Sequence, residues 1–169
     1  MPFLILAPYF SVATLNISMG IQDDIKQRSF TSSRQKALIN VLYTYGWTIE
    51  QIKNMLAPAD VTHQQYNILR ILRGAAPEPL STAQIRDRML DKMSDTSRIV
   101  DRLILKGLVK KCISAKDKRL VDVTITQQGL GLLKAVDAEP QQVDAIMSSL
   151  TEQEAETLSS LLDKMRNRD

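Results

Sequence analysis

The side chains best suited to chemistry in this chain are the hydroxyl and guanidinium groups of SDTSRIVDR, residues 94–102. Serine hydroxyls hydrogen-bond to phosphate oxygens, and an arginine can donate two hydrogen bonds to the O6 and N7 atoms of guanine. Side chains three and four residues apart lie on the same side of a helix. The pattern therefore predicts a nucleic-acid contact made by Ser94, Asp95, Ser97, Arg98 and Arg102.

Two carboxylates in this stretch limit how it can bind. Asp95 and Asp101 repel phosphate, so they must face bases, pair with Arg98 and Arg102, or lie clear of the DNA backbone. The opposite face of the helix is apolar and predicts contact with a core. This face consists of Thr96, Ile99, Val100, Leu103 and Ile104.

A second basic cluster occupies the turn AKDKR, residues 115–119. Lys116, Lys118 and Arg119 can reach a DNA minor groove, whose negative potential attracts an inserted arginine. Asp117 is costly there as a free charge, but paired with an arginine it would hold the turn in shape. The alternative interpretation is a hairpin tip that only contacts solvent.

Charge is distributed unevenly along the 169 residues, although the net charge is only +3. Residues 86–119 carry 11 Lys and Arg against 5 Asp and Glu, whereas residues 120–169 carry 4 against 9. Clustering of this kind is typical of a surface that binds a polyanion.

The composition argues against catalysis, metal binding and membrane insertion. Cys112 and His63 are the single cysteine and histidine, so no intramolecular disulfide can form, no Cys/His cluster offers metal ligands, and no Ser/His or Cys/His pair stands out. We expect no enzyme, no cofactor and a cytoplasmic location. The first 22 residues are uncharged, but a secretory signal needs a positive start and a spanning helix needs about 20 mainly apolar residues.

Apolar spacing and capping residues predict the elements that position these side chains. The spacing predicts a helix over 31–56, followed by helices that begin at Thr62, Ser81, Ser94, Thr126 and Thr151. Ile85, Met89 and Leu90 should lie on the buried side of the helix that follows Ser81. Residues 108–114 and 120–125 read as a half-buried hairpin.

These elements predict a mainly α fold with a small β-hairpin (α+β). The two helices before Gly107 form a helix-turn-helix. We expect an N-terminal extension over 1–30, a dimerisation helix over 31–60, a DNA-binding lobe over 61–125 and C-terminal dimerisation helices over 126–169.

The stretches SDTSRIVDRLILKGLVKK and DKRLVDVTITQQG resemble the recognition helix and the wing of MarR-family winged helix-turn-helix transcription regulators. The resemblance runs from Thr62 to Gly129. It implies that Ser94, Ser97 and Arg98 meet the major groove, that Arg119 meets the minor groove, and that Asp117 braces the wing. It also implies a phosphate contact for Lys111, a homodimer and a small-molecule effector.

The resulting hypothesis is a regulator that binds a palindromic site in double-stranded DNA as a homodimer, as a ligand-responsive repressor. Tyr43, Trp47 and Tyr66 are candidates for an effector pocket, although aromatic residues at helical spacing are more often part of a core. The alternative is a winged-helix module that binds an acidic protein.

Overall fold

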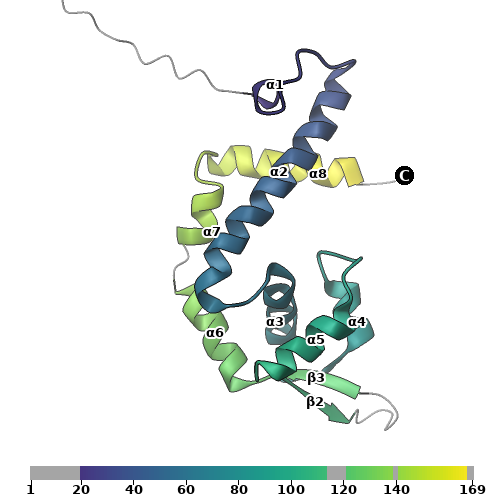
Figure 1. The fold of residues 1–169 in the computed structure, drawn as a ribbon, viewed down its shortest axis with the longest axis vertical. Helices are drawn as coiled ribbons and strands as arrows, with labels where there is room; N and C mark the ends of the chain where they lie inside the picture. Colours follow the sequence, from purple (N-terminus) through teal and green to yellow (C-terminus); the bar gives the residue numbers. More distant parts are fainter. Residues whose placement is uncertain (1–19, 114–120, 139–140, 167–169) are drawn as a thin grey trace, which may run out of the picture. The chain divides into compact units, whose positions relative to one another are not determined.

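The computed structural model describes residues 20–113, 121–138 and 141–166. The chain divides into two units at Tyr45 and Gly46. Helices dominate both units, and Figure 1 labels each element. They are α1 (Ile21–Asp24), α2 (Ser33–Leu56), the 3-10 helix η1 (Ala57–Ala59), α3 (His63–Ala75), α4 (Thr82–Arg88), α5 (Thr96–Leu105), α6 (Gln127–Asp137), α7 (Gln141–Ile146) and α8 (Glu152–Arg166).

Most helix starts lie where the capping residues predict them. Thr62 and Ser81 each form a capping box. The cap hydroxyl accepts from the backbone N–H three residues later, and the glutamine side chain at that position accepts from the N–H of the cap residue. The Thr126 hydroxyl accepts from the Gly129 N–H, and Thr151 exchanges hydrogen bonds with Glu154. The first long helix begins at Ser33, two residues after the predicted start.

Three short strands form an antiparallel sheet in the order β1-β3-β2. The predicted hairpin is β2 (Val109–Ile113) and β3 (Val121–Ile125), with Val109 opposite Ile125. The third strand, β1 (Leu80–Ser81), pairs Leu80 with Val123. Two residues are too few to show an alternating pattern, so the sequence did not reveal this strand.

Two glycines fix the join between α5, the sheet and α6. Gly107 follows the end of α5 with a φ of 69°, the left-handed conformation that glycine adopts without steric cost. A Cβ added at Gly129 would lie 2.3 Å from the Leu108 carbonyl oxygen, so only glycine fits there. The Thr126 hydroxyl spans the join, because it donates to the Gly107 carbonyl at 2.7 Å.

The core lies entirely within the second unit and collects apolar residues from α2 to α6. Its fully buried side chains include Ile68 and Leu69 on α3, Ile85 on α4, Leu103 on α5 and Leu133 on α6. The core therefore holds α5 against α3 and the sheet, as Figure 1 shows. The predicted burial of Leu90 is wrong. It is 88% exposed, because α4 ends at Arg88 and the chain leaves the helical phase before it.

The first unit contains α1 and the first half of α2. Ile21 is buried there, whereas Leu38 and Leu42 on α2 are exposed. Among the described residues, we find no helix that combines the length and apolar character needed to cross a membrane.

Candidate nucleic-acid interface

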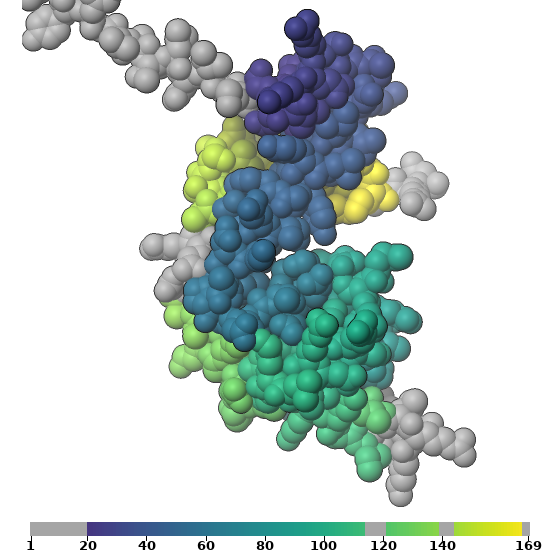
Figure 2. All heavy atoms as spheres, in the orientation of Figure 1, coloured from purple at the N-terminus to yellow at the C-terminus, as the bar shows by residue number. Residues whose placement is uncertain are grey.

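Helix α5 separates its residues into a buried and an exposed face, as predicted. Thr96, Val100 and Leu103 are buried against the core, whereas Ser97, Arg98 and Arg102 are exposed. Figure 2 shows α5 at the surface of the second unit, with no other element over it on this side. Its polar side chains are consequently accessible to a large ligand.

The N-cap of α5 is Asp95, so the predicted helix start at Ser94 is wrong by one residue. An oxygen of the Asp95 side chain accepts from the Arg98 N–H at 3.2 Å. Serine and aspartate are about equally good N-caps, so the sequence alone could not choose between two neighbours. The choice follows from the turn, where the Ser94 hydroxyl donates to Oδ2 of Asp91 at 2.5 Å.

Asp91 organises the turn between α4 and α5. In addition to the Ser94 hydroxyl, it accepts the Met93 N–H at 3.0 Å. The hydrogen bond from Ser94 and, to a smaller extent, the one from Met93 lower the pKa of Asp91 below its ordinary value, because both favour the carboxylate. The turn is also fixed to α3, since the Leu90 N–H donates to the Asn67 side chain at 3.0 Å. Hydrogen bonds within the turn and to α3 thus hold the residues that precede α5.

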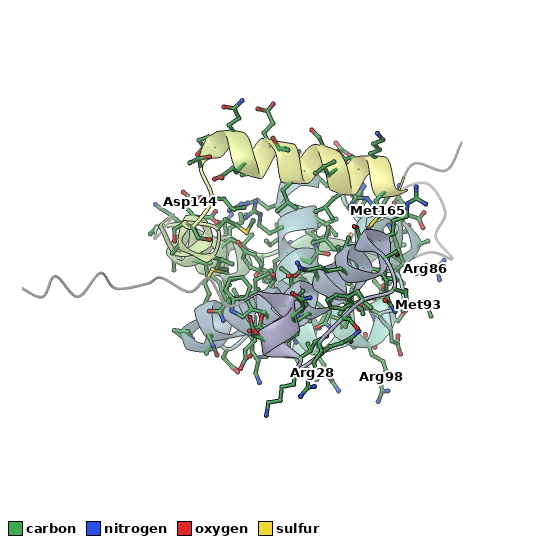
Figure 3. All side chains as sticks on the ribbon, turned by 90° about the horizontal axis from the view of Figure 1, so that it is seen from above. Arg28, Arg86, Met93, Arg98, Asp144 and Met165 are labelled. Atoms are coloured by element: carbon green, nitrogen blue, oxygen red, sulfur yellow. The ribbon has the colours of Figure 1, made fainter. Side chains whose placement is uncertain are left out.

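The two arginines of α5 have no partner among the described residues. The guanidinium groups of Arg98 and Arg102 make no ion pair or hydrogen bond within that part of the chain. Figure 3 shows the Arg98 side chain pointing outward, beyond the ribbon. The predicted alternative in which Asp95 and Asp101 pair with these arginines is therefore not what the structure contains.

Asp101 instead pairs with Lys111 on β2, at 2.8 Å between its carboxylate and the lysine Nζ. Both side chains are about half exposed. Lys111 thus sits beside α5, but part of its charge is already balanced. Its predicted phosphate contact stays a prediction, as do the base contacts of Ser94, Asp95, Ser97, Arg98 and Arg102.

The wing tip lies outside the described residues. This applies to the predicted minor-groove residues Lys116, Lys118 and Arg119 and to the predicted brace Asp117. The strands that lead to this tip, β2 and β3, are described, and β2 lies beside α5 in Figure 1.

Two of the aromatic candidates for an effector site lie on α2, and the third lies on α3. Tyr43 belongs to the first unit and is 45% exposed, and Trp47 in the second unit is 42% exposed. Tyr66 is half-buried, and its hydroxyl accepts from Nη1 of Arg70 at 2.9 Å. The effector site therefore stays a prediction from the sequence.

A cavity of about 210 Å³ lies between α4 and the start of α5. Sequence reasoning missed four of its residues, among them the hydrogen-bond donors Thr82 and Arg86. A signal was available, because the Ser81 capping box fixes the phase of α4 and places Thr82 and Arg86 one turn apart on the same face. The cavity is lined by Thr82, Ala83, Arg86, Ser94, Asp95, Thr96 and Ser97.

Comparison with known proteins agrees with this geometry. The model of the MarR family matches residues 59–120, which contain α3, α4, α5 and β2. The crystal structure of a MarR transcription factor from Planctomyces limnophilus is 32% identical in sequence. The match covers 80% of this chain and 98% of that one, with a TM-score of 0.61. The chain belongs to the MarR family.

Two further MarR proteins share less sequence identity with this chain. The Multiple antibiotic resistance protein MarR of Salmonella typhimurium is 28% identical over 116 residues, which are 68% of this chain and 79% of that protein. A mutant MarR from E. coli, crystallised with operator DNA, shares the fold at a TM-score of 0.71 and 23% identity. That match covers 82% of this chain and 100% of the other.

These findings confirm the predicted class. The chain is a MarR-family winged helix-turn-helix transcriptional regulator, mainly α with a small antiparallel sheet. The expectation that it is not an enzyme is also supported, because members of the MarR family are transcriptional regulators.

Proposed function

We propose that this protein binds a specific sequence in double-stranded DNA by inserting α5 into the major groove. The observation that carries the proposal is the exposed face of α5, where the side chains of Ser97, Arg98 and Arg102 have no partner among the described residues. A guanidinium that is free and exposed can form the paired hydrogen bonds by which arginine recognises guanine. The buried face fixes α5 to the core, so these groups are presented in a defined orientation.

A MarR-family relative supports the same assignment. The E. coli MarR with which this chain shares its fold was crystallised with operator DNA. The basic turn of the wing would add a minor-groove contact through Arg119, with Lys116 and Lys118 near phosphates and Asp117 as a brace.

The proposal includes a homodimer. On α2, Leu38, Leu42 and Tyr45 are 55%, 63% and 60% exposed, and on α8, Leu161 and Met165 are 59% and 56% exposed. Apolar surface repeated along a helix favours burial against another chain. A two-fold dimer would place two copies of α5 about 34 Å apart, which matches successive major grooves on a palindromic site. Light scattering should therefore give twice the chain mass.

In the cell, we propose that the dimer acts as a repressor in the cytoplasm and is released from DNA by a small-molecule effector. This part of the proposal follows from membership of the MarR family and not from the geometry of the site. Transcription from the selected operator, measured with and without the protein, distinguishes a repressor from an activator.

Selection of bound duplexes from a random pool tests the central claim. The full chain should enrich one motif with two half-sites. In a mobility-shift titration, Arg98→Ala should weaken binding to that motif by about 1–3 kcal/mol. Its loss of affinity for random duplex should be smaller. Arg73→Ala is the matched control, because that arginine is paired with Asp137.

Two results would contradict the proposal. One is a pool without any enriched motif. The other is an Arg98→Ala protein that discriminates between duplexes as well as the wild type does. Binding to an acidic protein without any binding to duplex DNA would instead identify the alternative, a winged-helix interaction module.

A further inference from the structure

The cavity between α4 and α5 has the size and chemistry of a small-anion site. Its volume is about 210 Å³. Pockets that take drug-sized ligands usually enclose about 300–1,000 Å³, so this one suits a smaller group. Four residues with hydroxyl groups, one arginine, one aspartate and Ala83 line it, so polar side chains that can donate hydrogen bonds stand beside one carboxylate.

Three donors in this cavity are unoccupied. The Arg86 guanidinium and the hydroxyls of Thr82 and Ser97 make no hydrogen bond or ion pair within the described residues. By contrast, the Ser94 hydroxyl is bound to Asp91, and the Thr96 hydroxyl points inward to the sulfur of Met89 at 3.3 Å. The free donors come from both helices, so they converge only in the folded protein.

The backbone at the start of α5 adds to this donor set. The Ser97 N–H lies in the first turn of a ten-residue helix and has no acceptor among the described residues. Such N–H groups and the helix dipole favour a negative charge at this end of a helix.

One acidic group works against an anion. Asp95 lines the cavity, and its carboxylate caps α5 by accepting from the Arg98 N–H. Its charge repels a phosphate, so it should weaken the site without abolishing it. This opposition is useful, because the charge of Asp95 can be removed without loss of the cap: asparagine caps a helix as well as aspartate does.

We propose that this cavity seats one backbone phosphodiester of the bound duplex, held by Arg86, Thr82 and Ser97. The inference rests on the proposed DNA-binding function. Ser97 lines the cavity and is the chain neighbour of Arg98, so a phosphate seated there would lie next to the groove that Arg98 enters. Phosphate contacts of this kind set the register of a protein on DNA but do not read its sequence. Arg86 is thus a positioning residue for α5.

Arg86→Gln and Arg88→Gln form a matched pair that tests the site. Both residues are exposed on α4 and both changes remove one positive charge, but Arg88 does not line the cavity. Arg86→Gln should weaken binding by about tenfold for each subunit that contacts the duplex, as expected for a lost charge-assisted hydrogen bond. The loss should be equal for selected and random duplex, and the salt slope should fall by about one per subunit. Arg88→Gln should cost much less.

A second variant changes binding in the opposite direction. Asp95→Asn keeps the cap, so its melting temperature should match that of the wild type, but it should bind both duplexes more tightly than the wild type does. Methylphosphonate substitution then locates the contact, because a neutral linkage at the seated phosphate should weaken the wild type and leave Arg86→Gln unaffected.

The outcomes separate this inference from the proposed function. Equal losses for Arg86→Gln and Arg88→Gln, or an unchanged affinity for Asp95→Asn, would overturn the phosphate seat even if Arg98→Ala abolishes discrimination. If no motif is selected, the proposed function fails, and binding of the same variants to random duplex still decides whether the seat exists.

Discussion

The arginines of α3 and those of α5 have opposite surroundings. Arg70 and Arg73 on α3 both pair with Asp137 at the end of α6, and Arg70 also contacts Tyr66. Arg98 and Arg102 on α5 have no partner among the described residues. The same side chain therefore serves two purposes: on α3 it joins two helices, and on α5 it remains available to a ligand.

The physical effect of pairing is visible at Arg70. Its guanidinium lies 5.7 Å from the centre of the Tyr66 ring and donates to the Tyr66 hydroxyl. This hydrogen bond is the main reason that the pKa of Arg70 is raised, and the carboxylate of Asp137 contributes in the same direction. A cation that is already paired in this way gains less from a phosphate than an unpaired cation does.

The largest expected difference between the two regions is in their response to salt concentration. If the α5 face and the wing together make about 6–10 phosphate contacts, affinity for duplex DNA should fall roughly 10³- to 10⁵-fold between about 50 and 200 mM salt. The pairs around Asp137 lie within the protein, so the melting temperature should shift little over this range. Fluorescence anisotropy and thermal melting give the two curves. An affinity that does not change with salt would place the DNA contact elsewhere.

Replacing one arginine of each region with alanine should have opposite effects on DNA binding and on stability. Arg102→Ala should weaken duplex binding by about 1–2 kcal/mol and leave stability within about 0.5 kcal/mol, because the side chain is exposed and unpaired. Arg70→Ala should leave binding unchanged and lower stability. DNA titration measures binding and urea unfolding measures stability for both variants. An equal loss of binding in the two variants would contradict the prediction.

Asp137→Ala should reduce the free energy of unfolding by about 0.5–1 kcal/mol. The effect is modest because Arg70, Arg73 and Asp137 are one third to one half exposed, and water screens the pairs. Asp163→Ala is the control: it breaks a pair with Arg166 on the same helix, which should cost about 0.2–0.5 kcal/mol. An equal cost in urea unfolding would show that Asp137 does not connect α3 to α6.

The smallest expected effect concerns the turn before α5. Because the folded pKa of Asp91 lies below its unfolded value, the stability it contributes is present above about pH 4 and is lost as pH falls through the folded pKa. Melting curves below about pH 4 should decline less steeply for Asp91→Asn than for the wild type. His63, whose charge also favours the Asp91 carboxylate, is kept in both proteins. Parallel declines would contradict this role for Asp91.

The fold and the site differ in how far the sequence predicts them. Thr62, Ser81 and Thr126 mark helix starts because a capping side chain binds a backbone group only three residues away. The choice between Ser94 and Asp95 failed because it depends on Asp91 and on the shape of the turn. Leu90 was misplaced for the same reason, since its burial depends on where α4 ends.

The sequence by itself determined the order of α2 to α6 and α8, the hairpin, and the division of α5 into an apolar and a polar face, because each of these depends on residues a few positions apart. Only the tertiary structure decided that Asp101 pairs with Lys111, that Asp137 holds Arg70 and Arg73, and that an open cavity lies between α4 and the start of α5. Those contacts join side chains whose separation is set by how helices and strands pack. That packing depends on the whole core, so no local pattern of residues encodes it.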